Sequence, residues 1–127
     1  MLLTDKTAIV YGAGGSIGGA VARAFAAEGA RVHLVGRTRE TLEAVAADLK
    51  DAEVAVVDAL DETAVEEHLA RVGEVDVSFN LVTRGDVQGA PLTDMAVDDF
   101  LRPVINGVRA NFVTARAAGR RMAERGS

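Results

Sequence analysis

A cluster of glycines near the start of the chain has the composition and spacing of a phosphate-binding turn. The segment reads Gly12-Ala13-Gly14-Gly15-Ser16-Ile17-Gly18-Gly19. Glycines here would allow a tight turn, a close approach of the backbone to a diphosphate and close packing of the helix that follows. Free backbone N–H groups at the start of that helix, together with the helix dipole, would then hold the anion.

The glycine spacing fits two known patterns and fails a third. Gly12, Gly15 and Gly18 follow G-x-x-G-x-x-G, and G-x-x-x-G-x-G fits with Ser16 in place of its second glycine. G-x-G-x-x-G fails because Ile17 stands at its third glycine. A flexible turn is the plainer interpretation, but a position between a strand-like and a helical segment favours nucleotide binding, with Ser16 capping the helix or binding phosphate. We predict nucleotide contacts at Gly12, Gly14, Gly15, Ser16, Ile17 and Gly18.

A basic segment lies about 20 residues after the glycine turn, where dinucleotide-binding folds discriminate the ribose. It reads Gly36-Arg37-Thr38-Arg39. An acidic residue here would accept a hydrogen bond from a ribose 2′-hydroxyl, whereas the Arg37 guanidinium suits a 2′-phosphate. Arg37 and Arg39 could also be solvated loop residues. We predict NADP as the cofactor in preference to NAD, with Arg37 and Thr38 in its site.

Asp58 ends a third apolar segment and is followed by Ala59-Leu60-Asp61. A carboxylate at the carboxyl end of a strand lies on the ligand-binding edge of a parallel sheet. Asp58 could therefore accept a hydrogen bond from an adenine amino group. The alternative role, helix capping, is assigned mostly to Asp61.

Strand-like and helical segments alternate along the chain to position these residues. The predicted strands span residues 7–11, 32–35, 54–57 and 75–82, and the predicted helices span 17–28, 41–49, a segment after Asp61, and 97–124. A loop is predicted from Arg84 to Thr93, and Pro103 should kink or divide the last helix.

Near-continuous apolar strands alternating with helices predict a parallel sheet covered on both faces. Right-handed crossovers favour the first half of a doubly wound α/β sheet, the Rossmann arrangement, with strand order 3-2-1-4 and a long C-terminal helix. We expect residues 1–127 to form a single, incomplete dinucleotide-binding domain.

Composition excludes several other classes of protein. The 127 residues are 49% apolar and 26% charged and contain no cysteine, so a disulfide scaffold and a cysteine-ligated zinc site are excluded. No segment suits a membrane span or a signal peptide, so we expect a soluble, cytoplasmic protein. The net charge of −5 argues against nucleic-acid binding, and arginines between Arg102 and Arg125 are expected on a solvated helix face. His33 and His68 lack the partners of a metal site.

In order and spacing, these motifs resemble the N-terminal part of the short-chain dehydrogenase/reductase family. The resemblance implies that the glycine turn holds the pyrophosphate, Arg37 the 2′-phosphate, and Asp58 with the Ala59 backbone the adenine. Asn80 matches the first residue of the family's Asn-Asn-Ala-Gly stretch, which steadies the sheet and lines the cofactor site. The resemblance rests on Gly12 to Gly18, Gly36-Arg37, Asp58-Ala59-Leu60-Asp61, Asp76-Val77-Ser78-Phe79-Asn80, Pro91-Leu92-Thr93-Asp94-Met95 and the helical region from Asp98 to Met122.

The chain also departs from the family pattern. Tyr11 stands where a threonine is usual, and Leu81-Val82-Thr83 follow Asn80. Gly107 falls at the family's catalytic asparagine; Asn106 and Asn111 lie nearby but out of register. These differences indicate a divergent member.

The family's catalytic Tyr-x-x-x-Lys is absent from the 127 residues. The one tyrosine is Tyr11, and the lysines are Lys6 and Lys50. A tyrosine needs a neighbouring cation to act as an acid or base near neutral pH. We therefore predict no catalytic residue in this chain and no turnover by it alone.

The leading hypothesis is the NADP-binding portion of an oxidoreductase that moves hydride between a nicotinamide and a carbonyl or alcohol. A small-molecule substrate would bind only in the full-length parent. The alternative is a non-catalytic nucleotide-binding or regulatory module. A flavodoxin-like phosphoacceptor domain is disfavoured because glycines occupy the end of the first strand. We also expect a homo-oligomer, formed through the edge of the fourth strand or the Val104, Val108 and Phe112 stripe.

Overall fold

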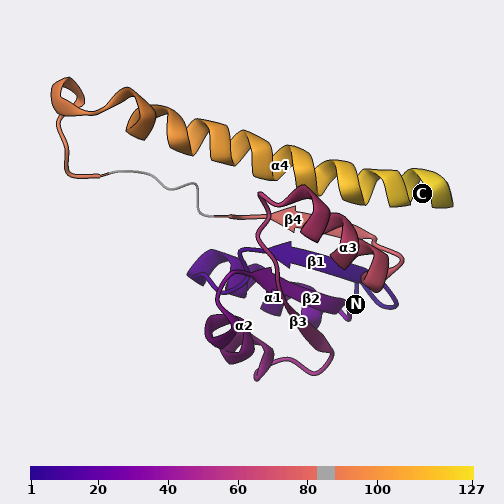
Figure 1. The fold of residues 1–127 in the computed structure, drawn as a ribbon. Coiled ribbons are helices and arrows are strands. Elements are labelled where there is room, and N and C mark those ends of the chain that lie inside the picture. Colours follow the sequence, from indigo (N-terminus) through magenta and orange to yellow (C-terminus); the bar gives the residue numbers. More distant parts are fainter. Residues whose placement is uncertain (83–87) are drawn as a thin grey trace.

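The computed structural model describes residues 1–82 and 88–127. Within these residues, four strands pair in parallel in the order β3-β2-β1-β4, which confirms the predicted topology (Figure 1). The predicted loop residues Arg84 to Val87 lie outside the described residues, as does Thr83. The elements are β1 (Thr7–Tyr11), α1 (Ser16–Ala27), β2 (Arg31–Gly36), α2 (Arg39–Ala46), β3 (Ala52–Val56), α3 (Glu62–Val72), β4 (Val77–Asn80), the 3-10 helix η1 (Leu92–Asp94) and α4 (Val97–Arg125).

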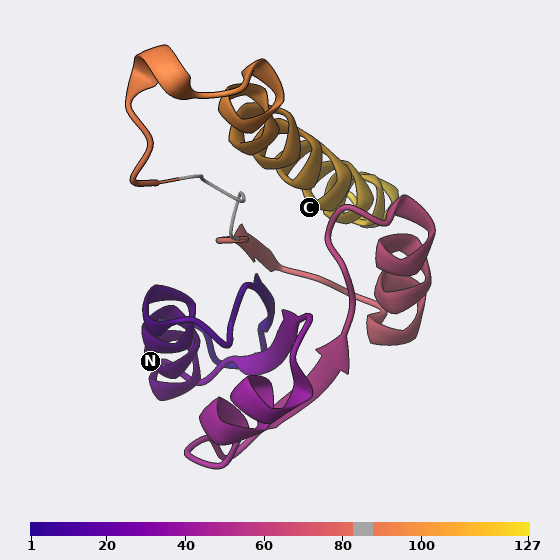
Figure 2. The ribbon, with the colours of Figure 1, turned by 60° about the vertical axis from the view of Figure 1, so that its left-hand side comes forward.

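Helices cover both faces of the sheet, as the apolar strands predicted (Figure 2). Alternate residues of a strand point to opposite faces. Ala8 and Val10 of β1 therefore pack with α1 and α2, whereas Ile9 and Tyr11 pack with α3 and α4. The sheet is thus the middle of three layers, and the turns after its strands are left free at the carboxyl edge.

Local signals set most of the element ends. Asp61 caps α3 by accepting a hydrogen bond from the Ala64 backbone N–H at 3.1 Å, and Gly29 follows the end of α1 with φ of +96°. The strand β4 is shorter than the predicted 75–82 segment. Asp76 precedes it, and the Leu81 N–H extends the pairing by one bond, to the Tyr11 carbonyl at 2.9 Å.

Pro103 does not divide α4, which runs without a break from Val97 to Arg125. The proline lies in the second turn, so its missing N–H removes only one hydrogen bond near the helix start. The N-terminal half of α4 extends beyond the sheet (Figure 1) and leaves Phe100, Val104 and Val108 more than half exposed. No helix in the described part of the chain is both long enough and apolar enough to cross a membrane.

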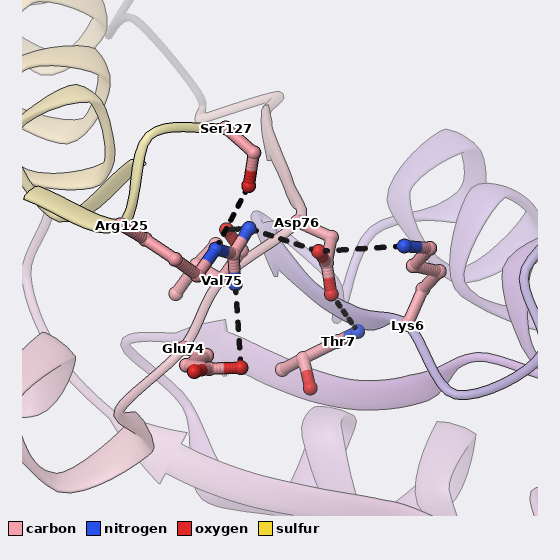
Figure 3. Close-up of polar contacts among 7 residues, drawn as sticks. All are labelled: Lys6, Thr7, Glu74, Val75, Asp76, Arg125 and Ser127. Carbon is pink, nitrogen blue, oxygen red and sulfur yellow. Dashed lines mark hydrogen bonds and ion pairs between the residues drawn. The ribbon is translucent and has the colours of Figure 1, made fainter. Parts of the chain in front are cut away.

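The C-terminal end of α4 is fastened at the amino edge of the sheet by a charged cluster (Figure 3). The Arg125 guanidinium donates to an Asp76 carboxylate oxygen at 3.0 Å and to the Val75 carbonyl at 3.3 Å. The Thr7 N–H donates to Asp76 at 2.9 Å. This backbone hydrogen bond, with the charge of Arg125, lowers the pKa of Asp76 below its ordinary value. The cluster therefore joins α4, β1 and the segment before β4.

Arg102, Arg109 and Arg120 of α4 are exposed, as expected of a solvated face, but several arginines of this helix also pair with acids. Arg116 forms an ion pair with Glu62, and Arg120 and Arg121 approach Glu66 at 3.2 and 3.6 Å. The partners belong to α3, which lies beside α4 on the same face of the sheet. Arginines of α4 and acids of α3, distant in sequence, thus meet between the two helices.

Candidate nucleotide-binding site

A cavity of about 770 Å³ lies at the carboxyl edge of the sheet. Its volume is within the range of small-molecule and cofactor sites. The turns after β1, β2 and β3 form its walls, together with the residues that follow β4. The predicted residues that line it are Gly12, Gly14, Gly15, Ser16, Ile17, Gly18, Arg37, Thr38, Asp58 and Ala59.

The first turn of α1 presents backbone N–H groups to this cavity. Gly15 is the N-cap residue, and no side chain caps the helix. The first N–H groups of a helix have no partner within it, and the positive end of the helix dipole lies there. Ser16 is the first helical residue, so its predicted capping role is wrong. The exposed Ser16 hydroxyl remains beside the helix N-terminus, where it can meet an anion.

The protein's own backbone accounts for two of the glycines. Gly12 has φ of +80°, and a Cβ atom there would lie 2.1 Å from the Leu81 carbonyl oxygen. A Cβ atom on Gly18 would lie 2.1 Å from the Gly12 carbonyl oxygen. A Cβ atom on Gly15 would meet nothing closer than 3.5 Å. The turn and its packing alone therefore require glycine at positions 12 and 18. The close approach of a diphosphate, the other reason given for glycines in this turn, is not needed to explain these two.

Hydrogen bonds to β2 hold the glycine turn next to the basic segment. The Gly12 and Ala13 N–H groups donate to the Val35 carbonyl at 2.8 and 3.2 Å. Arg37 follows two residues later, is exposed and lines the cavity. In the described part of the chain, no carboxylate lies within ion-pair distance of Arg37. Thr38 is the N-cap residue of α2 but makes no side-chain capping bond, and its carbonyl accepts a hydrogen bond from the Thr41 hydroxyl at 2.9 Å.

Asp58 orders the turn between β3 and α3. One of its carboxylate oxygens accepts from the Leu60 N–H at 2.9 Å, and its carbonyl accepts from the Asp61 N–H at 2.9 Å. The side chain is half-buried at the cavity wall, next to the buried Ala59. Asp61 caps α3 as predicted, and Asp58 lines the cavity, where its contact with adenine stays a prediction.

Asn80 is the predicted site residue that does not line the cavity. Its side-chain amide donates instead to the side-chain oxygen Oδ1 of Asn111 in α4. The next residues, Leu81 and Val82, line the cavity in its place. Sequence reasoning did not find these two, nor Tyr11, Val35, Gly36, Thr41, Leu42, Val57 and Gln88, which also line it.

The Tyr11 side chain is buried, and its hydroxyl has no hydrogen-bond partner in the described residues. Burial raises the pKa of the Tyr11 phenol well above its ordinary value, and the negative charge of Glu66 raises it further. Tyr11 therefore stays protonated at neutral pH, which does not suit a general base.

The two histidines lie together inside the protein, away from the cavity. Their rings meet edge to face, with centroids 6.1 Å apart, and His33 Nδ1 lies 3.7 Å from a Glu53 carboxylate oxygen. Residues 1–82 and 88–127 contain no group of three or more potential ligands placed to hold a metal ion. A buried packing role fits both side chains.

Comparisons with known proteins agree with this geometry. The family model of the short chain dehydrogenases matches residues 6–127. An uncharacterized oxidoreductase of Staphylococcus aureus (strain USA300) is 35% identical over 132 residues, which cover 99% of this chain and 56% of that protein. An uncharacterized oxidoreductase of Mycobacterium tuberculosis (strain CDC 1551 / Oshkosh) is 38% identical, over 96% of this chain and 47% of that protein.

Solved structures show the same likeness. Levodione reductase superposes with a TM-score of 0.86 at 30% identity, over 98% of this chain and 52% of that one. Xylitol dehydrogenase with bound NAD⁺ superposes with a TM-score of 0.87 at 32% identity, over 98% of this chain and 51% of that one. The chain thus spans about half the length of the curated relatives it matches. On its sequence, its strand order and its glycine turn, the chain belongs to the short-chain dehydrogenase/reductase family.

Proposed function

We propose that residues 1–127 are part of a dinucleotide-binding domain that holds NADP(H) in an oxidoreductase acting on a carbonyl or alcohol substrate. One observation supports this most strongly. The uncapped N-terminus of α1, the exposed Arg37 and the carboxylate of Asp58 border a single cavity at the carboxyl edge of the sheet. These groups offer N–H donors, a cation and an acceptor, which match a diphosphate, a 2′-phosphate and an adenine amino group.

The residues around the cavity offer a suitable partner for each polar part of a dinucleotide. The N–H groups of Ser16, Ile17 and Gly18 would hold the diphosphate, because they begin a helix with no side-chain cap. Arg37 would take the 2′-phosphate through charge-assisted hydrogen bonds. Asp58, held by the Leu60 N–H, would accept from adenine. When bound, the nicotinamide supplies the hydride chemistry, and this chain would hold the adenine half of the cofactor.

Calorimetric titration with NADP and with NAD tests this assignment. We expect the chain to bind NADP at least about tenfold more tightly than NAD, because a charge-assisted pair contributes roughly that factor. Arg37→Ala should weaken NADP binding about tenfold and leave NAD binding nearly unchanged. Arg39→Ala is the matched control, since Arg39 is exposed, pairs with Glu43 and does not line the cavity.

Two results would count against the cofactor assignment. Equal affinity of the native chain for NADP and NAD would show that Arg37 does not bind the 2′-phosphate. Arg37→Ala could instead weaken the binding of both dinucleotides while Arg39→Ala weakens neither. Arg37 would then contact a group that NAD and NADP have in common rather than the 2′-phosphate. No binding of either dinucleotide would contradict the proposed site itself.

We further propose that this chain self-associates through α4. Val104, Val108 and Phe112 are 55%, 65% and 59% exposed, and they lie at helical spacing along one stripe. An antiparallel pair of two such helices that centres on Val108 would place Val104 of one copy opposite Phe112 of the other. A second copy of the chain therefore complements the apolar stripe.

A further inference from the structure

The carboxyl end of β4 forms one wall of the cavity and lies directly against the glycine turn. Leu81 and Val82 line the cavity, and the Leu81 N–H donates to the Tyr11 carbonyl at 2.9 Å. The Leu81 carbonyl approaches Gly12 so closely that a Cβ atom there would lie 2.1 Å from its oxygen. A displacement of this end of β4 toward the glycine turn must therefore move the backbone of that turn.

Within residues 1–82 and 88–127, one side-chain hydrogen bond ties this end of β4 to α4. The Asn80 amide nitrogen donates to the Asn111 side-chain oxygen, and Asn80 directly precedes Leu81. The Asn80 oxygen is buried without a hydrogen-bond partner in the described residues. Elsewhere in residues 1–82 and 88–127, the side-chain bonds from α4 to the β4 segment come from Arg125 and reach Val75 and Asp76, before the strand begins.

We propose that Asn111 is a positioning residue for the dinucleotide site, a role that rests on the function proposed above. Asn111 does not line the cavity. It fixes the Asn80 side chain, and through it the Leu81 backbone that supports the Gly12 turn. The helix α4 then holds β4 at both ends, with Arg125 at the amino end and Asn111 at the carboxyl end.

The acceptor oxygen of Asn111 is the feature that performs this role. Asn111→Asp keeps an acceptor at the same distance from the helix axis and strengthens the bond to the Asn80 amide. Asn111→Leu has nearly the same size and offers no acceptor, so the Asn80 amide loses its partner. Asn111 is exposed, so either side chain can be accommodated. Asn106→Leu is the matched control, because it makes the same change on the same helix without a described bond to β4.

Calorimetry with NADP at about 0.15 M salt, where distant charges are screened, gives the first measurement. We expect Asn111→Leu to weaken NADP binding about fivefold, and Asn111→Asp and Asn106→Leu to stay within about twofold of the native chain. Asn111→Leu binding NADP as tightly as the native chain would overturn the proposal. Equal losses in the Leu and Asp variants would do so too, because the acceptor would then be irrelevant.

Amide NMR spectra without any ligand give the second measurement. The Leu81, Gly12 and Ala13 amide resonances should move in Asn111→Leu, return toward native positions in Asn111→Asp and stay in place in Asn106→Leu. Native positions of all three resonances in Asn111→Leu would contradict the role of Asn111. If no chain binds NADP, the proposed function fails, while these spectra still decide whether Asn111 positions the turn. Should Asn111→Leu not fold by circular dichroism, Asn111→Ala replaces it in both measurements.

Discussion

His33 and His68 are the buried titratable side chains that the proposed site does not use. His33 comes from β2 and His68 from α3, and both are less than 10% exposed. Burial, with smaller contributions from the nearby His33 and Arg71, lowers the pKa of His68 from 6.5 to about 4. Burial also lowers the pKa of His33, with a smaller contribution from Arg31, while Glu53 and Asp51 oppose the shift. Both imidazoles are therefore neutral in the folded protein at pH 7.

We predict that acid destabilises the fold through His68. Between its ordinary pKa of 6.5 and its folded value of about 4, the unfolded chain binds a proton that the folded chain does not. The free energy of unfolding is therefore highest above pH 6.5 and falls as the pH drops, by about 2 kcal/mol between pH 7 and pH 5. Urea unfolding of the native chain and of His68→Phe at both pH values measures this contribution.

The phenyl ring of His68→Phe keeps an aromatic side chain in place and removes the titrating group. Its stability should change less between the two pH values, and the decline that remains comes from His33, whose pKa burial also lowers. Asp76 does not contribute to this difference. Because its pKa is lowered in the folded protein, the stability that it contributes is lost only below about pH 3.8. An equal decline in both proteins would show that His68 does not cause the acid sensitivity.

At the scale of the elements, hydrophobic periodicity predicted the strands and helices, and most ends differ by one or two residues. The pattern could not predict that β4 begins at Val77, because Val75 is as apolar as the strand itself. The Asp76 side chain instead accepts hydrogen bonds from the Thr7 N–H and the Arg125 guanidinium. Proline chemistry alone overstated the effect of Pro103 on α4. These errors arise where tertiary contacts, which no local pattern contains, decide the outcome.

The exposed stripe of α4 gives the prediction at this scale. At high protein concentration, light scattering should show a mass above that of one chain. Val104→Glu combined with Val108→Glu should return it toward the monomer mass, because two charges cannot be buried between apolar helices. Leu2→Glu is the control, since Leu2 is 85% exposed outside α4. A monodisperse native monomer, or association unchanged by the double substitution, would contradict an interface at α4.

At the scale of the whole molecule, the strand order brings the turns after β1, β2 and β3 to one edge and makes a cavity from residues far apart in sequence. The glycine turn, Arg37 and Asp58 could be predicted because each follows a recognisable strand. Thr41, Leu42 and Gln88 could not, since they reach the cavity only through the packing of their segments. The Asn80–Asn111 bond joins residues 31 positions apart, and no spacing rule encodes it.

The central claim is that the glycine turn at the start of α1 binds the diphosphate of a dinucleotide. Titration of the isotopically labelled chain with NADP, followed by amide NMR, tests it residue by residue. We predict that the largest shifts fall at Gly14 to Gly18, with further shifts at Arg37, Thr38 and Asp58, and none at Thr7 or Asp76 on the opposite edge. Saturable shifts elsewhere with an unchanged glycine turn, or no shifts at millimolar NADP, would contradict the claim.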